Sequence, residues 1–304
     1  MRVTVDPPLN RWKLGAGERR SGDRAWMGPA NDRPIIATGH QAWLWHPGIL
    51  AKDIAAVEAG RQLGAQVVHL VVDHDTQDAM TLDLPVVCGE PGSERLDVAT
   101  VELGHVQTGV PTGMQPPFNA NAMAKRIGDA VQRIGANGGH IAVDSQPILS
   151  AMEATDGVAT LAEQMTSVIV QLMPPIVGDV AFVNSSDMLD NDVGRALVQR
   201  MLEDAQCCVA RFNDAVTTHH DAGVRALRVE RERVELPLWH IAWEQPRQRV
   251  FADVSDSKPL LVNEAGEVLE LADDHAKLAP RALLLSAMMR TWYCDLFIHG
   301  KSGG

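Results

Sequence analysis

The sequence predicts an α/β protein with a mostly parallel sheet, helices on both faces of that sheet and a small antiparallel extension. Short apolar segments recur along the 304 residues, and several of them end at a polar cluster. Segments with helical spacing of apolar residues lie between them, which is typical of a doubly wound sheet. Apolar residues make up 45% of the chain, enough for a buried core, and this argues against global disorder.

The clearest unit spans residues 34–78. An apolar segment ends at the Thr-Gly-His-Gln cluster of residues 38–41, and a helix is expected over Pro47–Leu63, where proline suits the first helical position. A second apolar segment, Val67–Val72, stops at the Asp-His-Asp cluster of residues 73–75. A strand, a helix and a strand in this order form a unit with parallel strands, and ligands bind outside the carboxyl ends of such strands.

The rest of the chain is expected to form strands and helices in the following order. They are a hairpin near 80–103, a loop at 104–120, a helix to Ile134, a strand at His140–Val143, a helix at Val158–Met173, a strand at Val180–Val183, a helix at 192–208, two hairpins within 234–271, a helix at Pro280–Thr291 and a strand at Asp295–Ile298. We expect residues 34–304 to form one domain. Residues 1–33 are expected to form an extended arm pinned by Trp12 and Trp26, or a loosely packed tail.

Charge and cysteine content narrow the range of functions. The formal net charge is −12, which disfavours nucleic acid and anionic membranes as partners. The four cysteines form no Cys-x-x-Cys pair, which favours reduced thiols in a cytoplasmic protein. No segment is long and apolar enough to span a membrane. Familiar phosphate-binding and hydrolase motifs are absent, so the candidate site depends on the convergence of several polar clusters.

The 38–41 cluster and the following helix are candidates for anion binding. Gly39 allows close backbone approach, while Thr38, His40 and Gln41 offer hydrogen bonds. His46 precedes the helix start, whose partial positive charge favours anions, and Lys52 could add a full charge. The alternative is that Thr38 and Gln41 satisfy loop backbone and His46 caps the helix.

The 73–75 cluster is a candidate for acid–base work. Asp73 and Asp75 could orient or deprotonate a substrate amine with His74 nearby, or hold a metal; the alternative is a turn with a helix cap. Three weaker candidates follow other predicted elements. Asn184 could bind hydroxyl groups, although its surroundings resemble a helix-capping sequence; Arg281, at a helix start, could bind an anion; and His299 follows the last strand.

Several of these residues resemble a known family. The chain resembles the cysteine ligase family of bacillithiol synthesis at Thr38-Gly39-x-Gln41-Ala42, Lys52, Asp73-His74-Asp75 and Asp78. Two shorter similarities occur later in the chain, at Glu235-Leu236-Pro237-Leu238-Trp239 and at Leu278-x-Pro280-Arg281-Ala282-Leu283. The resemblance implies a Rossmann-like core akin to nucleotidyltransferases, a ligation of cysteine to an amino-sugar conjugate, and a homodimer built on a coiled coil. The chain departs from the family at His40 and Val72, shows no heptad-rich coiled coil and has a short C-terminal region, so we expect either a shortened relative or a truncated gene product.

The sequence therefore predicts a ligase or transferase that forms a C–N bond between an amino acid such as cysteine and a small amine- or sugar-containing acceptor. Asp73, His74, Asp75 and His40 are the expected catalytic residues. The expected substrate-binding residues are Thr38, Gly39, Gln41, His46, Lys52, Asp78, Asn184, Arg281 and His299. No metal is assigned, and a nucleotide is the one cofactor considered. The alternatives are a metal-dependent hydrolase that uses His40, His46, Asp73 and His74, and a non-catalytic small-molecule-binding protein.

Overall fold

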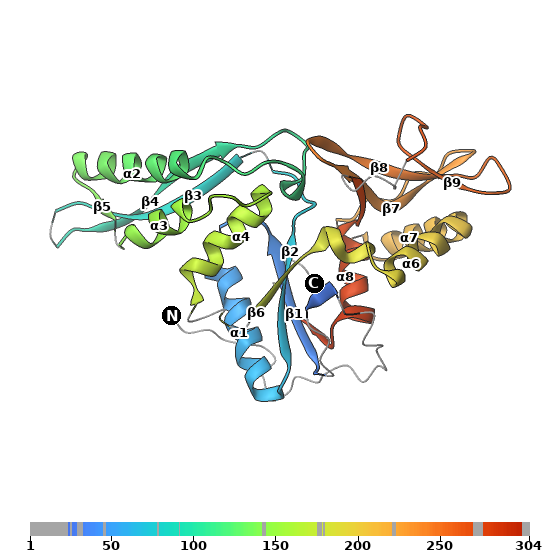
Figure 1. Cartoon of the computed structure of the whole chain (residues 1–304), viewed down its shortest axis with the longest axis horizontal. Coiled ribbons are helices and arrows are strands. Elements are labelled where there is room, and N and C mark those ends of the chain that lie inside the picture. The colour runs from blue at the N-terminus through green and yellow to red at the C-terminus, as the bar shows by residue number, and fades with distance from the viewer. Residues whose placement is uncertain are drawn as a thin grey trace.

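The computed structural model describes residues 24, 26–28, 33–44, 47–77, 79–90, 92–141, 144–174, 178, 180–220, 223–269 and 276–299. The strands of this part of the chain form one parallel sheet and two antiparallel sheets. Figure 1 shows the parallel sheet at the lower centre, with an antiparallel sheet above it on each side.

The parallel sheet contains the first two predicted strands. Its order is β11 (Leu296–Phe297), β1 (Ile35–Gln41), β2 (Gln66–Val72) and β6 (Val180–Asn184), and every neighbouring pair is parallel. Helix α1 (Pro47–Leu63) connects β1 to β2, which confirms the strand–helix–strand unit. The carboxyl ends of β1 and β2 lie side by side, because Gln41 is in register with Val72.

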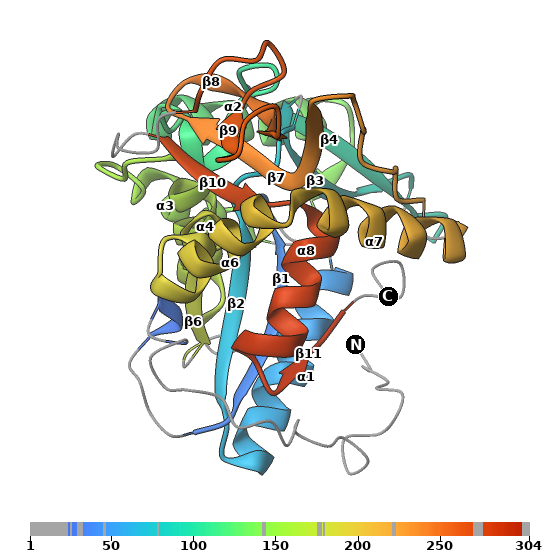
Figure 2. The ribbon, with the colours of Figure 1, turned by 90° about the vertical axis from the view of Figure 1, so that its right-hand side faces the viewer.

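Helices cover both faces of this sheet, as Figure 2 shows. Successive side chains of a strand point to opposite faces. Ile36 of β1 packs with Ala56 and Ala59 of α1 on one face. Its neighbours Ile35 and Ala37 belong to the core on the other face, which includes residues of α7 (Ala205–Thr218) and α8 (Ala282–Met288). The expectation of helices on both faces is confirmed for this sheet.

The first antiparallel sheet is an insertion between β2 and β6. It has the order β4 (Arg95–His105), β3 (Ala79–Cys88) and β5 (His140–Ile141). Its core includes residues of α2 (Ala120–Ala136), α3 (Gln146–Glu153) and α4 (Leu161–Leu172). A short 3₁₀ turn, η3 (Thr112–Met114), precedes α2.

The second antiparallel sheet has the order β10 (Ala276–Pro280), β7 (Arg233–Ala242), β8 (Gln245–Asp253) and β9 (Leu260–Val262). Between β6 and this sheet the chain forms the 3₁₀ turn η4 (Ser185–Leu189), α6 (Asp192–Glu203) and α7. After it come α8 and the short π-helix η6 (Met289–Tyr293). Of the two hairpins predicted within 234–271, the first is β7–β8. In the described part of the second, Val262 and Val268 form a single antiparallel bridge.

Two features of the predicted fold are corrected. The fold is mixed α/β, but the sheet content of the described residues is not mostly parallel: their two antiparallel sheets have three and four strands, and their parallel sheet has four. The expected strand at His140–Val143 does not join the parallel sheet; its described part is β5, which pairs antiparallel with β3. The physical reason is that an apolar segment of this length is compatible with either sheet, and tertiary pairing decides between them.

The prediction of one domain from residue 34 onward stays a prediction. Most of the expected N-terminal arm, Trp12 included, lies outside the described residues. Trp26 is described, and it packs edge-on against Tyr293 with ring centroids 5.1 Å apart. The extended arm and its alternative, a loosely packed tail, both stay predictions.

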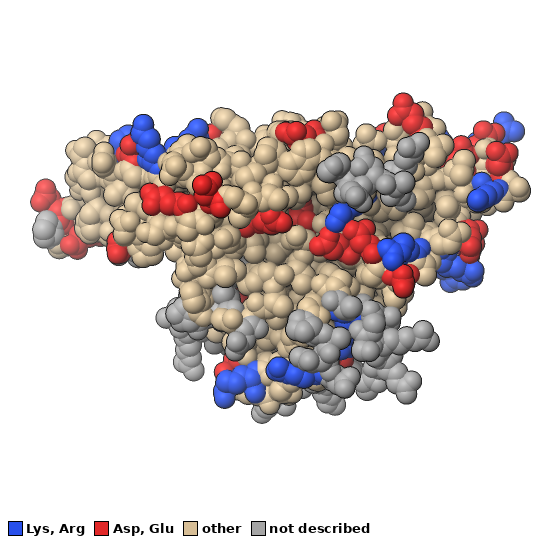
Figure 3. Space-filling view, in the orientation of Figure 1, with Lys and Arg blue, Asp and Glu red and all other residues tan. Residues whose placement is uncertain are grey.

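No helix in the described part of the chain has the length and apolar character needed to cross a membrane. Figure 3 shows Asp, Glu, Lys and Arg side chains dispersed over one face, with no broad blue area among its described residues. The cytoplasmic location and the absence of nucleic-acid partners stay predictions.

Candidate functional site

A cavity of about 630 Å³ lies at the carboxyl ends of three parallel strands. Residues at the ends of β1, β2 and β11 line it on one side, together with the first turns of α1. Residues of β7, β8 and the start of α8 line it on the other. The lining residues are Gly39, His40, Gln41, Gly48, Ile49, Lys52, Leu70, Val72, His74, Asp75, Trp239, Arg247, Arg281, Ala282, Leu285, Ser286, Phe297 and His299.

The 38–41 cluster and α1 supply the first wall. Lys52 Nζ donates a hydrogen bond of 2.9 Å to the Gly39 carbonyl oxygen, which fixes the ammonium group beside the end of β1. Burial lowers the pKa of Lys52 from its ordinary value, and the charge of Asp53 opposes that shift. His40 Nδ1 accepts a hydrogen bond of 2.9 Å from Trp43 Nε1. Because Nδ1 accepts, a neutral His40 ring carries its proton on Nε2.

Asp75 joins the two predicted clusters. Its Oδ2 accepts a hydrogen bond of 3.2 Å from Gln41 Nε2, and its Oδ1 accepts one of 3.0 Å from Arg247 Nη1. The same Nη1 donates to the His74 carbonyl oxygen at 3.1 Å. The expectation that these two loops meet at one edge of the sheet is therefore confirmed for His40, Gln41, His74 and Asp75.

Asp73, one of the predicted catalytic residues, is held by two serines at the end of β6. Its carboxylate accepts hydrogen bonds from Ser185 Oγ at 2.9 Å, Ser186 N at 2.9 Å and Ser186 Oγ at 2.6 Å. The side chain is buried and does not line the cavity. Because these donors hold both carboxylate oxygens at the start of η4, Asp73 ties the end of β2 to the end of β6.

His74 is also held by this cluster. Its Nδ1 lies 2.7 Å from Ser185 Oγ, and burial lowers the pKa of the imidazole, although the charge of Asp73 opposes the shift. The residue lines the cavity, but Nδ1 is engaged with Ser185. We therefore assign His74 to the cavity wall, where it also places its carbonyl oxygen against Arg247.

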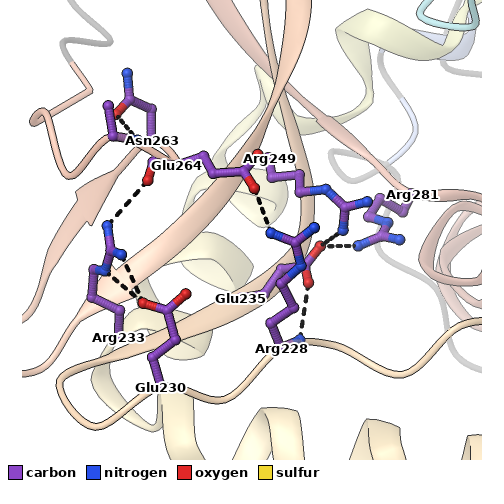
Figure 4. A network of polar contacts seen from close by, with 9 residues as sticks. Arg228, Glu230, Arg233, Glu235, Arg249, Asn263, Glu264 and Arg281 are labelled. Carbon is purple, nitrogen blue, oxygen red and sulfur yellow. Dashed lines mark hydrogen bonds and ion pairs between the residues drawn. The ribbon is translucent and has the colours of Figure 1, made fainter.

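Aromatic and cationic side chains form the opposite wall. Two arginines pack against the ring of Trp239 in β7. The guanidinium carbon of Arg247 lies 4.4 Å from the ring centroid, and that of Arg281 lies 4.9 Å from it. Arg281 Nη1 donates to Oε1 of the buried Glu235 at 2.6 Å, as Figure 4 shows. Of the charged lining residues, Lys52, Arg247 and Arg281 are cationic and Asp75 is anionic, so the cavity has a positive balance within an acidic chain.

His299, at the end of β11, closes this site. Burial lowers its pKa to about 4, and the charges of Arg290 and Lys52 act in the same direction, so the ring is neutral near pH 7. Its Nε2 atom is buried and has no hydrogen-bond partner among the described residues. A neutral imidazole with an unpaired nitrogen at a cavity is a suitable hydrogen-bonding group for a ligand.

Two other predicted residues, Thr38 and Asn184, do not line this cavity. Thr38 is buried and donates to the Ile298 carbonyl oxygen at 3.3 Å. Asn184 lines a separate cavity of about 260 Å³ together with Asp73 and Ser186. His46 and Asp78 lie outside the described residues.

Three residues of the site escaped the sequence analysis. Arg247 lies near the tip of the predicted hairpin, and Trp239 and Glu235 were expected only as part of a motif echo. Their partners are far away in sequence: Arg247 and Asp75 are separated by 172 residues, and Glu235 and Arg281 by 46. No local pattern could have paired Arg247 with Asp75 or Glu235 with Arg281.

The alternative of a metal-dependent hydrolase needs a set of metal ligands, which the described residues do not supply. The described residues contain no group of three or more His, Cys, Asp or Glu side chains that could hold a metal ion. Of its four expected ligands, His46 lies outside the described part, and the carboxylate of Asp73 is engaged by two serines.

No protein-family model matches the chain, and no curated protein matches it.

Proposed function

We propose that the protein is a ligase or transferase that joins an amino acid, with cysteine as the first candidate, to a small amine- or sugar-containing acceptor in this cavity. One observation carries the proposal. One cavity, at the carboxyl ends of parallel strands, is lined by predicted residues from five separate segments: His40, Gln41, Lys52, Asp75, Arg281 and His299. Ligands bind at this place in open α/β sheets.

The residues have complementary roles in this proposal. Lys52 and the first turn of α1 attract an anionic group of the substrate through a full charge and the helix dipole. Asp75 accepts a hydrogen bond from the substrate amine and orients it as the nucleophile, with His40 Nε2 and His299 as further hydrogen-bonding groups. These roles fit a reaction in which positioning of two small substrates supplies much of the rate.

A nucleotide is the cofactor that the family resemblance suggests, and the cavity fits one in part. Lys52 and the start of α1 suit phosphate groups. The Trp239 ring is less suited to stacking a base, because two arginines already pack against it. When bound, a nucleoside triphosphate would supply activation of the amino-acid carboxyl group.

The first test changes the charge at the β1 end. In Lys52→Met we expect the affinity for the substrate to fall at least about tenfold, because an anion would lose its only lysine contact in the described cavity wall. In Asp75→Asn we expect product formation to fall further than substrate binding, because an amide orients an amine poorly. Substrate binding is measured by calorimetry. Product formation is measured with cysteine, an amino sugar and a nucleoside triphosphate as the substrates.

Two variants of exposed residues serve as controls. Lys125→Met on α2 and Asp97→Asn on β4 make the same chemical changes away from the cavity and should leave binding and turnover unchanged. Binding in Lys52→Met at the wild-type affinity would overturn the assignment of this wall. Tight binding without turnover for any amino-acid and acceptor pair would favour a non-catalytic binding protein.

A further inference from the structure

Two arginines share one indole ring at the wall of the cavity that faces the parallel sheet. Arg247 and Arg281 pack against Trp239, and each is also held by a carboxylate, Asp75 for the first and Glu235 for the second. Among the described residues, the hydrogen bonds of both guanidinium groups use only Nη1. A guanidinium has five N–H donors, so each arginine keeps donors for a ligand.

The charges at this wall do not balance. Oε1 of Glu235 accepts from Arg249 Nη1 and from Arg281 Nη1, each at 2.6 Å, while Oε2 accepts from the backbone N–H of Arg228 at 2.9 Å. Figure 4 shows the two guanidinium groups converging on this one carboxylate. With Arg247 and Asp75 included, three cations meet two anions.

The unbalanced charge is partly removed from water. Glu235 is completely buried, and the side chain of Arg281 is only 19% exposed. Burial lowers the pKa of the Arg281 guanidinium, and the neighbouring charges of Arg249 and Arg247 act in the same direction against the pull of Glu235. An incoming anion would relieve this repulsion, and an arginine pair offers the fork geometry that carboxylates and phosphates accept.

We infer that Arg247 and Arg281, fixed against Trp239, form an anion subsite that binds a carboxylate or phosphate group of the substrate. This subsite is separate from the Lys52 end of the cavity. The inference rests on the proposed function and adds to it that the substrate carries an anionic group on the part that faces β7. Glu235 is the positioning residue for Arg281: it touches no ligand, but it sets where the guanidinium lies.

The subsite is tested with inorganic phosphate and with succinate, each titrated calorimetrically into the whole protein. We expect at least one of them to bind, and its affinity to fall at least about tenfold in Arg281→Gln and in Arg247→Gln. Binding of phosphate alone assigns a phosphate group, and binding of succinate alone assigns a carboxylate. Binding of neither anion to the wild type at millimolar concentration would overturn the subsite, as would wild-type affinity in Arg281→Gln.

The chain offers a matched control in Arg233. This arginine of β7 likewise packs against an aromatic ring, 5.7 Å from the ring centroid of Phe251, and pairs with Glu230 at 2.7 Å, but it does not line the cavity. Arg233→Gln should bind the probe anion as the wild type does. An equal loss in Arg233→Gln and Arg281→Gln would mean that net charge alone drives the binding, and the subsite would be rejected.

The positioning role is tested by a double-mutant cycle. Because Glu235 acts through Arg281, Glu235→Gln should weaken probe binding in the wild type but cause little further loss in the Arg281→Gln background. Additive losses would overturn the positioning role. If Glu235→Gln fails to fold, the Arg247 and Arg281 variants still decide the subsite. A protein that binds the probe at Arg281 yet forms no ligation product would contradict the proposed reaction and leave the subsite intact.

Discussion

At the residue scale, His299 connects the stability of the molecule to pH. The ordinary pKa of a histidine is about 6.5, and burial lowers that of folded His299 to about 4. Between these values the unfolded chain binds a proton at this position and the folded chain does not. The contribution of neutral His299 to stability is therefore complete above about pH 6.5 and declines as the pH falls toward 4.

This linkage predicts the behaviour of His299→Gln. Glutamine does not titrate, so the variant should lose less stability than the wild type when the pH is lowered from about 7 to about 5. The measurement is urea unfolding of both proteins at the two pH values. His219→Gln, at an exposed position, should keep the wild-type pH dependence. Parallel pH profiles for His299→Gln and the wild type would show that His299 does not titrate abnormally.

At the scale of elements, the approach of β1 to β2 depends on Gly39. Gly39 is in register with Leu70, and a Cβ atom at position 39 would lie 2.7 Å from the Leu70 carbonyl oxygen and 3.0 Å from its Cβ. Both strands are central in the sheet, so neither can move aside without disturbing its other neighbour. The residue thus keeps the ends of the two strands, and the side chains that line the cavity, close together.

Gly39→Ala is therefore expected to reduce the free energy of unfolding by about 1–3 kcal/mol, the usual cost of forcing extra atoms into a packed interior. Ligand affinity should fall as well, because His40 and Gln41 follow directly in β1. Gly128→Ala in α2 is the control: a Cβ there meets open space, and alanine is the better helix former, so stability should rise slightly. Wild-type stability in Gly39→Ala would contradict the close approach described here.

Local patterns predicted the elements that are defined by nearby residues. The unit β1–α1–β2 was predicted from its sequence because its helix start, its apolar spacing and its polar strand ends all lie within 34–78. The strand at His140 was assigned to the wrong sheet, since nothing local distinguishes a partner in β3 from one in the parallel sheet. The buried pair of Asp53 Oδ1 and His69 Nδ1, 2.7 Å apart, was not predicted either, because an isolated aspartate in a helix resembles a surface residue.

The same limit applies to the candidate site. The β1 and β2 ends could be predicted as one rim because parallel strands joined by a helix place their carboxyl ends together. The wall built from Trp239, Arg247 and Arg281 could not, because it depends on how the second antiparallel sheet packs above that rim. The hydrogen-bond partners of Asp73 could not be predicted either, because Ser185 and Ser186 lie 112 and 113 residues away in sequence.

At the scale of the whole molecule, Asp295 joins three segments that are distant in sequence. Its Oδ2 accepts a hydrogen bond of 2.8 Å from the Ile35 backbone N–H and lies 3.0 Å from Arg24 Nη2. Its own N–H donates to the Ile35 carbonyl oxygen at 2.8 Å, just before β11 pairs with β1. One carboxylate therefore ties the start of β1 to the strand that brings Phe297 and His299 to the cavity.

Asp295→Ala tests this connection. The substitution leaves the N–H of the buried Ile35 and the largely buried guanidinium of Arg24 without their acceptor, and leaving such groups unpaired costs about 1–3 kcal/mol of folding free energy. We expect a loss of that size in urea unfolding. Because β11 lines the cavity, the anion affinity should fall too. Asp256→Ala, in an exposed loop, should change stability by no more than about 0.5 kcal/mol. If the two variants were equally stable, β11 would have to be held by its strand pairing and apolar contacts alone.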